Sequence, residues 1–212
     1  MNHMLSKNII AADIYRNSDV ISTLSESARL PTSHGEFKMR VFKDGTGMDH
    51  VIIYKGKIRD AENIDVRVHS ECMTSEVFRS LKCDCNEQLA WALDHIEKKG
   101  VGLVIYLRQE GRGIGLFNKI RAYALQDAGH DTITANTELG FEEDQRTYEV
   151  AVQLLEAFRI KSINLITNNP LKIGELRKYG INIKRRIPIH IKPNVHNKDY
   201  IKIKMEKMNH LP

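Results

Sequence analysis

The sequence predicts a single α/β domain: a mixed β-sheet covered by helices, with an antiparallel N-terminal part. Three observations lead to this prediction. Short segments of alternating polarity separated by turn residues fill the first half, which is typical of antiparallel strands. In the second half, apolar strand-like runs alternate with helix-like segments. The 212 residues are 42% hydrophobic, enough for one core, and no linker or repeat divides them.

The first half begins with residues 1–27, which we expect to be a weakly ordered extension before a domain of residues 28–212. Two stretches follow, LPTSHGEFKMRVF and DHVIIYKGKI, and they predict antiparallel strands. The sequence DGTG at residues 44–47 predicts the turn that joins them. Val66 and Val68 begin a further strand, which leads into a cysteine-rich segment.

The second half predicts helices and strands in alternation. NEQLAWALDHIEKKG has apolar residues at helical spacing and predicts a helix ending at Gly100; Trp91 lies off the apolar stripe, so we expect it to be partly exposed or packed elsewhere. VGLVIYL predicts a buried strand, followed by a glycine-rich turn and a helix. Further helices are predicted at residues 142–158, from Pro170 to Gly180 and at residues 198–208, with strands SINLITNN and INIKRRIPIHI between them.

The composition limits the cellular location. The first residues, MNHMLSKNIIAADIYRNSD, carry charges throughout and lack the apolar core of a signal peptide. The best apolar run, residues 101–107, is far too short to span a membrane. Three clustered cysteines, an odd number, argue against a disulfide framework and for a reducing compartment. We therefore expect a cytoplasmic protein with no membrane partner.

All three cysteines lie in one short window, Cys72-x10-Cys83-x-Cys85. Soft thiolates select zinc, and no iron–sulfur spacing is present. Three protein ligands leave the fourth position of a tetrahedral metal open, which is typical of a catalytic zinc that holds water. The two alternatives are inert buried thiols and a structural site completed by His69.

A glycine-rich segment, EGRGIG, follows the predicted strand and opens the next helix. This arrangement points backbone amides and a helix N-terminus at an anion. Arg112 strengthens the case for a phosphorylated ligand, because a guanidinium forks onto phosphate oxygens. The segment is neither a Walker loop nor a dinucleotide fingerprint, and a plain tight turn is the alternative.

The formal net charge is +5, and much of the excess lies in a basic run after residue 183, interleaved with isoleucines. Such a run is usually a solvated face. It can also attract polyanions, either nucleic acid or the phosphates of a nucleotide. The run alone does not separate the two.

Several motifs together resemble the GTP cyclohydrolase II family, the first enzyme of riboflavin biosynthesis. They are RVHSEC, KCDC, YLRQEGRGIGL, NKIRAYALQD, TNNP and KMNHL, in uninterrupted order from about Leu30 to the C-terminus. The resemblance implies that GTP loses diphosphate, that its imidazole ring opens, and that C8 leaves as formate. It also implies Zn²⁺, Mg²⁺ on the GTP phosphates, and a homodimer.

The resemblance assigns site residues by matched position. Cys72, Cys83 and Cys85 match the zinc ligands. Asp144 matches the proton acceptor, Arg146 the nucleophile, and Tyr123 a tyrosine near the base. The nucleotide-contacting positions fall on Arg67, Val68, His69, Ser70, Glu71, Gln88, Glu110, Gly111, Arg112, Thr132, Thr167 and Lys172. Of these, Gln88 and Glu110 are the candidates for reading guanine, and Lys172 for meeting phosphate with helix amides.

Two of these assignments raise chemical questions. A guanidinium has a pKa above about 12 and no free lone pair, so Arg146 would need strong help to attack phosphorus. Its second possible role is to stabilise negative charge on the α-phosphate while water attacks. Asp144, two positions away, would point elsewhere on a regular helix, a geometry that a loop or helix start would relax; a helix-capping carboxylate is its alternative role.

The zinc itself raises another question. Three thiolates outweigh the charge of a zinc ion and should blunt its effect on a bound water. We expect nearby cations, or a hydrogen bond from His69 or Tyr123, to compensate.

A zinc-stabilised nucleic-acid-binding module is the rival interpretation, suggested by the basic C-terminal third and a pI near 9.0. The chain lacks four-cysteine and two-cysteine, two-histidine ligand patterns and an aromatic-rich binding face. We therefore expect GTP as the ligand and no nucleic-acid partner.

Overall fold

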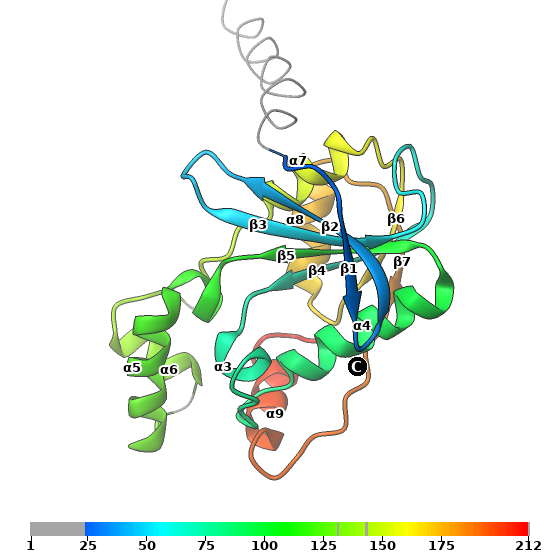
Figure 1. Ribbon diagram of the computed structural model, residues 1–212. Coiled ribbons are helices and arrows are strands. Elements are labelled where there is room, and N and C mark those ends of the chain that lie inside the picture. The colour runs from blue at the N-terminus through cyan, green and yellow to red at the C-terminus, as the bar shows by residue number, and fades with distance from the viewer. Residues whose placement is uncertain (1–23, 131, 143, 212) are drawn as a thin grey trace, which may run out of the picture.

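The structure, a computed structural model, describes residues 24–130, 132–142 and 144–211; residues 1–23 of the expected extension lie outside this part. Seven strands in the described part form one mixed sheet in the order β1-β2-β3-β5-β4-β6-β7 (Figure 1). They are β1 (Ala28–Thr32), β2 (Gly35–Lys43), β3 (Asp49–Lys55), β4 (Ile64–Ser70), β5 (Gly102–Leu107), β6 (Ile163–Ile166) and β7 (Ile183–Ile187). The predicted α/β class is confirmed.

The first half of the chain supplies the antiparallel part, since β1, β2, β3 and β5 pair antiparallel in that order. The first predicted strand is in fact two, β1 and β2. Thr32 Oγ1 accepts a hydrogen bond from the His34 backbone N–H at 3.1 Å and makes a tight turn between them. The turn predicted at residues 44–47 is confirmed: Asp44 Oδ1 accepts from the backbone N–H groups of Thr46 (2.8 Å) and Met48 (2.9 Å).

Strand β5 also pairs parallel with β4 on its other side, and β4, β6 and β7 continue the parallel part of the sheet. Parallel neighbours need crossover connections, and helices α4 (Cys85–Lys99), α7 (Glu149–Ala157) and α8 (Pro170–Lys178) provide them. Every residue of β6 is buried, as is usual for a parallel strand with a neighbour on each side, here β4 and β7.

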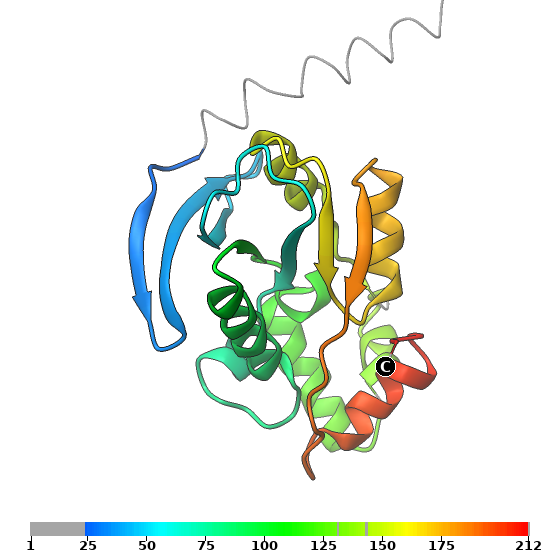
Figure 2. The same ribbon diagram turned by 90° about the vertical axis from the view of Figure 1, so that its right-hand side faces the viewer.

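Two hydrophobic clusters form the layers of the core. On one face, Ile96 of α4 packs with Val104 of β5. On the other, Leu154 of α7 and Leu176 of α8 belong to a larger cluster that includes Ile105. The adjacent residues Val104 and Ile105 therefore face opposite layers, as strand alternation requires. Figure 2 shows α4 and α8 on opposite sides of the sheet.

Most predicted helices are confirmed close to their predicted bounds. Helix α4 ends at Gly100, whose φ of 78° is left-handed. Trp91 is half-buried and stacks on His95, with 5.0 Å between ring centroids. Helix α8 begins at Pro170, capped by the Asn169 side chain, and α9 (Lys198–Glu206) is the predicted C-terminal helix. No helix in the described residues is long and apolar enough to cross a bilayer.

Two differences lie between α5 (Gly115–Asp127) and β6. Helix α6 (Thr132–Glu138) is not predicted from sequence. The helix predicted at residues 142–158 is wrong at its start, because α7 begins at Glu149. Asp144 Oδ1 accepts the Arg146 backbone N–H at 3.1 Å, and the Gln145 N–H donates to Arg112 O at 3.0 Å. These local bonds compete with helical ones and keep the segment a loop.

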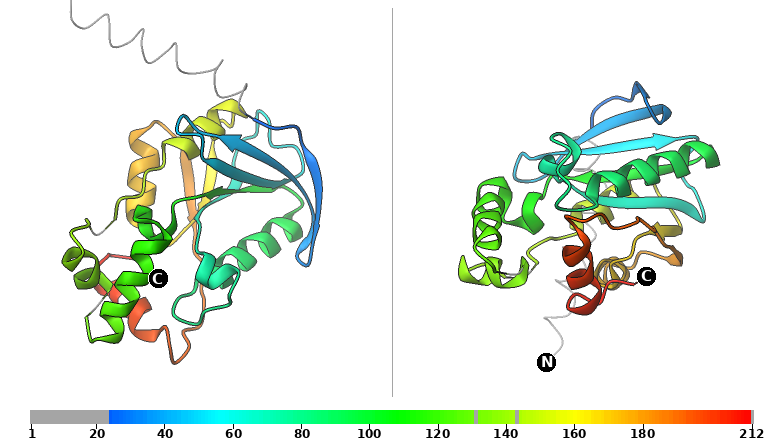
Figure 3. Two further views of the ribbon diagram at one scale, coloured as in Figure 1. Left: turned by 60° about the vertical axis from the view of Figure 1, so that its left-hand side comes forward. Right: turned by 90° about the horizontal axis from the view of Figure 1, so that it is seen from below.

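The carboxyl ends of the parallel strands meet at one edge of the sheet. Beyond it gather the short helix α3 (Met73–Glu76), the 3₁₀ turn η1 (Glu110–Gly113), α5, α6 and α9 (Figures 1 and 3). Strand β4 leads to Cys72, β5 to η1 and β6 to Thr167. Ligands bind at this edge in open α/β sheets.

Candidate active site

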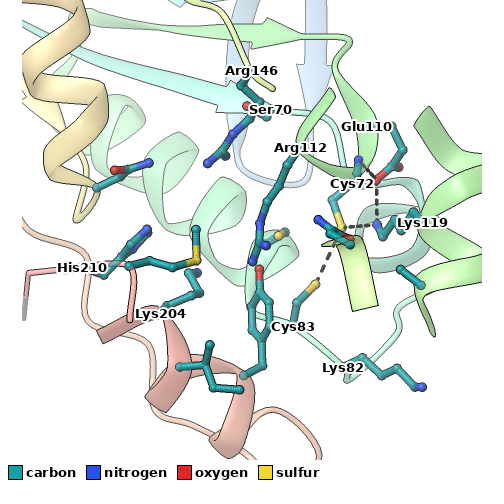
Figure 4. A pocket seen from close by; sticks show the side chains of 18 of the residues that line it. Ser70, Cys72, Lys82, Cys83, Glu110, Arg112, Lys119, Arg146, Lys204 and His210 are labelled. Atoms are coloured by element: carbon teal, nitrogen blue, oxygen red, sulfur yellow. Dashed lines mark hydrogen bonds and ion pairs between the residues drawn. The ribbon is translucent and has the colours of Figure 1, made fainter. Parts of the chain in front are cut away.

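A cavity of about 520 Å³ lies at this edge, within the range of about 300–1,000 Å³ common for small-molecule sites. Figure 4 shows Cys72 and Cys83 at one side, beside Lys119 and Glu110. The predicted site residues on its wall are Arg67, His69, Ser70, Glu71, Cys72, Cys83, Cys85, Gln88, Glu110, Gly111, Arg112, Tyr123, Arg146, Thr167 and Lys172.

Three predicted site residues are placed differently. The Val68 side chain is buried in the core, and only its carbonyl meets the site, accepting a hydrogen bond from Lys172 Nζ at 2.6 Å. Asp144 borders a smaller neighbouring cavity together with Pro170. Thr132 is the first residue of α6, and its side chain lies outside the described part.

The ligand atoms of Cys72, Cys83 and Cys85 lie within 4.8 Å of one another. Cys72 Sγ and Cys83 Sγ are 3.7 Å apart. Zn–S bonds of about 2.3 Å in a tetrahedron place two sulfurs about 3.8 Å apart, so the cluster fits zinc. His69 does not join this cluster, because its Nε2 lies 2.7 Å from Glu76 Oε1. The alternative of a structural site completed by His69 is therefore not supported.

The pKa values of the three thiols are shifted in different directions. Hydrogen bonds from Cys83 and Cys85, assisted by the Lys119 ammonium, lower the pKa of the Cys72 thiol. Hydrogen bonding to Cys72 in turn raises the pKa of Cys83 and of Cys85. Once one thiolate forms, its charge opposes the next. A bound dication would remove this opposition, and the donor set therefore suits a metal.

His69 is held by the half-buried carboxylate of Glu76. Tyr106 Oη donates to Glu76 Oε2 at 2.5 Å, and the rings of His69 and Tyr106 stack with centroids 5.7 Å apart. Burial lowers the pKa of His69, so the ring is neutral at neutral pH. Its Nε2–H then donates to Glu76, and Nδ1 faces Arg67 Nη2 at 3.4 Å. Both ring nitrogens are engaged within the protein.

Arg67 ties β4 to β6 and α4 from a position that is only 6% exposed. Its Nη1 donates to Ile166 O at 3.1 Å and its Nη2 to Gln88 Oε1 at 2.7 Å. Burial lowers the pKa of Arg67 to about 10, which leaves it charged at neutral pH. Gln88 also donates from Nε2 to Asp84 Oδ2 at 2.6 Å, so both ends of this amide are engaged.

Glu110 is directed at the segment that carries Cys72. Its Oε1 accepts from Lys119 Nζ at 2.7 Å and from the Gly111 N–H at 2.9 Å. Its Oε2 accepts from the Met73 N–H at 2.6 Å. Since a carboxylate offers about four acceptor sites, one remains for a ligand.

The glycine-rich segment is left-handed: Gly111, Arg112 and Gly113 have φ of 64°, 62° and 95°. At Arg112 this backbone is strained for a residue with a side chain, and Figure 4 shows that side chain reaching into the cavity. A Cβ on Gly113 would lie 3.0 Å from the Gln145 backbone. The chain thus needs glycine there to approach the Arg146 loop.

Asp144 and Arg146 form a two-point ion pair, with Nε to Oδ1 at 2.8 Å and Nη2 to Oδ2 at 2.5 Å. They lie in a loop, so their spacing is no obstacle, and Asp144 is not a helix cap because Tyr148 precedes α7. Burial alone would lower the pKa of Arg146, but the hydrogen bonds to Asp144 outweigh it and raise that pKa. Burial would raise the pKa of Asp144, and Arg146 instead lowers it.

Burial also shifts the pKa values of Tyr123 and Lys172. Burial raises the pKa of Tyr123 to about 12, so its hydroxyl stays protonated. Lys119 Nζ lies 5.7 Å from the centre of its ring. Burial, with Arg67 and Arg146 nearby, holds the pKa of Lys172 well below its usual range.

Several wall residues are missed from sequence. Lys119 precedes Tyr123 by four residues, one helical turn on the same face, and that spacing could have found it. Tyr200, Lys204 and His210 come from the C-terminal segment. His210 lies in the KMNHL motif and Lys204 in the basic run, but neither pattern assigned a site role to them. Lys204 Nζ pairs with Asp84 Oδ1 at 3.1 Å, so this lysine of the basic run is not solvated.

Comparisons with known proteins show which family the chain resembles. A model of the GTP cyclohydrolase II family matches residues 23–188. A GTP cyclohydrolase-2 of Campylobacter fetus subsp. fetus is 51% identical over 187 residues, covering 88% of this chain and 94% of the relative. One of Picrophilus torridus is 49% identical, covering 87% and 96%. The riboflavin biosynthesis protein RibBA of Endomicrobium trichonymphae is 48% identical, covering 86% of this chain and 45% of that protein. The chain belongs to the GTP cyclohydrolase II family.

Proposed function

We propose that this protein is a zinc-dependent GTP cyclohydrolase II. It hydrolyses GTP to 2,5-diamino-6-(5-phospho-D-ribosylamino)pyrimidin-4(3H)-one, formate and diphosphate, the first step of riboflavin biosynthesis. The observation that carries the proposal is a three-thiol cluster on the wall of a cavity that is also lined by arginine and lysine side chains. A cavity of that kind suits a ligand with a purine at one end and a triphosphate at the other.

Cys72, Cys83 and Cys85 would hold the zinc ion. The chemistry supplied there is Lewis acidity, which lowers the pKa of water from 15.7 toward about 7. Beside the thiols, the protonated Tyr123 hydroxyl can donate a hydrogen bond toward the purine. Glu110 keeps one acceptor site for the N1–H or amino group of guanine.

The phosphate end is assigned to the cations. Arg112 and Lys172 would bind phosphate oxygens, and Mg²⁺ held by the GTP phosphates would supply further positive charge for the diphosphate leaving group. Arg146, aimed by Asp144, would stabilise charge on the α-phosphate while water attacks and the bond to diphosphate breaks. The raised pKa of Arg146 supports this role over that of a covalent nucleophile, because attack needs a neutral guanidine. The proposed site is completed by residues 67–71, Thr132 and Thr167, which would contact the nucleotide.

A homodimer in a reducing cytoplasm is part of the proposal. Exposed apolar side chains at Phe78 (72%) and Phe117 (77%) offer a surface for association, which sedimentation equilibrium would test. Three free thiols are compatible with a reducing compartment. The alternative of a nucleic-acid-binding module is not favoured, because Lys204 of the basic run is half-buried and paired with Asp84.

The test is to incubate the purified protein with GTP and Mg²⁺ and to measure formate, diphosphate and a pyrimidine chromophore. All three should form, and removing the metal with a chelator under reducing conditions should stop formate release. Full activity of a metal-free protein in chelator would contradict the proposal.

Cys83→Ser separates the two chemical steps, because it removes a metal ligand but leaves the phosphate-binding cations in place. Formate release should be lost more severely than diphosphate release. If both vanish in a folded variant, the two centres are not separable.

A further inference from the structure

We propose that Lys119 and Glu110 form a charged clamp on Cys72. In this clamp the Lys119 ammonium changes the metal affinity and electronic properties of the thiol site, and Glu110 holds the ammonium in position. Lys119 is a positioning residue in this role, since it acts through a metal ligand. The inference rests on the metal-binding part of the proposed function.

The clamp is a closed ring of hydrogen bonds. Lys119 Nζ donates to Cys72 Sγ at 3.2 Å and to Glu110 Oε1 at 2.7 Å. The backbone N–H of Met73, the residue after Cys72, donates to Glu110 Oε2 at 2.6 Å. Figure 4 shows Lys119 between the thiol and the carboxylate. The ring joins the ligand segment to η1 and to α5.

The clamp is shielded from solvent. Lys119 is 9% exposed, Glu110 8% and Cys72 5%. Charges at such positions are screened little by water and salt. By contrast, Lys82 also lines the cavity but pairs with the exposed Asp127, and its own side chain is 42% exposed. Lys119 is therefore the cation, within the described residues, that contacts a ligand sulfur.

The chemistry gives this contact a purpose. Three thiolates carry one more negative charge than a zinc ion neutralises, and their electron donation weakens its Lewis acidity. An N–H···S bond from an ammonium withdraws electron density from one sulfur and offsets part of that excess. The Glu110 carboxylate holds the ammonium against Cys72. Glu110 is also the first residue of η1, the turn that carries Arg112. Partners of metal ligands commonly change metal affinity by about 10–100-fold.

The experiment measures the metal site directly, without GTP. Zinc affinity is measured by competition with a chromophoric chelator under reducing conditions, and the thiolate-to-cobalt charge-transfer band is recorded for the Co²⁺-loaded protein. Lys119→Met should weaken zinc binding about 10–100-fold and shift the band. Lys119→Arg, which keeps the charge and a donor, should recover most of both. The control Arg121→Met removes an exposed cation two residues along α5 and should match the parent protein.

The inference is overturned if folded Lys119→Met keeps the parent zinc affinity within about threefold, about 0.7 kcal/mol, and the parent cobalt band. Should Lys119→Met fail to fold because Glu110 is left unpaired, the Lys119→Met/Glu110→Gln double variant removes both charges and carries the same comparison. If the parent protein binds no zinc at all, the metal part of the proposed function fails too. If the parent binds zinc and the variants bind it equally, only the clamp fails.

Discussion

Replacing Arg146 with lysine keeps the positive charge but removes one hydrogen bond of the pair with Asp144. The guanidinium donates to both carboxylate oxygens, from side chains that are 15% and 16% exposed, whereas an ammonium on a flexible stem satisfies one at a time. A hydrogen bond to a charged group is worth about 1.5–3 kcal/mol. If the pair aims Arg146 at the α-phosphate, the loss slows diphosphate release by about 10–150-fold.

The assay follows diphosphate and formate from the same GTP reaction. For Arg146→Lys we expect a lower kcat for diphosphate release and little change in zinc content, because the pair does not touch the thiols. Arg159→Lys is the matched control: Arg159 also pairs with an aspartate, Asp60, at 2.9 Å, but on the surface, and this variant should behave like the parent.

Two results would refute this reasoning. One is an Arg146→Lys protein that releases diphosphate within about threefold of the parent, which would mean that the two-point geometry has no role in the transition state. The other is a phosphoryl adduct on Arg146, trapped by rapid quenching with labelled GTP. That adduct would establish the covalent role instead of charge stabilisation.

Two further predictions concern stability. The buried Asp65 has its pKa lowered: burial would raise it, but hydrogen bonds from its lysine and histidine partners outweigh burial. A lowered folded-state pKa gives stability that is present above the unfolded pKa near 4 and is lost as the pH falls. Asp65→Asn should therefore lower the free energy of unfolding, measured with urea, by about 2–4 kcal/mol at pH 7 and by less at pH 3. An equal loss at both pH values would contradict this. Gly113→Ala should lower the unfolding free energy by about 1–3 kcal/mol through its approach to Gln145, and more than Gly115→Ala, where φ is also positive but no atom lies within 4 Å; equal losses would mean that the contact is not limiting.

Much of the fold and part of the site could be predicted because the signals are local. Periods of two and 3.6 residues distinguish strands from helices, and turn residues such as Asp44 act within a few positions. Where local hydrogen bonding competes with a helical pattern, prediction fails: the bonds of Asp144 and Gln145 delay α7 until Glu149. The apolar pattern of that region does not contain this information.

The sequence by itself determined the three-thiol cluster that could hold a metal, the α/β class and the family, because three thiols in one short window, strand and helix periods, and ordered motifs are all read over short distances. Only the tertiary structure decided which buried charges meet. Lys119 donates a hydrogen bond to Cys72 and another to Glu110, and Lys204 of the cavity wall donates one to Asp84. The physical reason is that parallel strands carry distant segments to one edge of the sheet. Which charges meet there depends on packing and burial, and no short stretch of sequence encodes them.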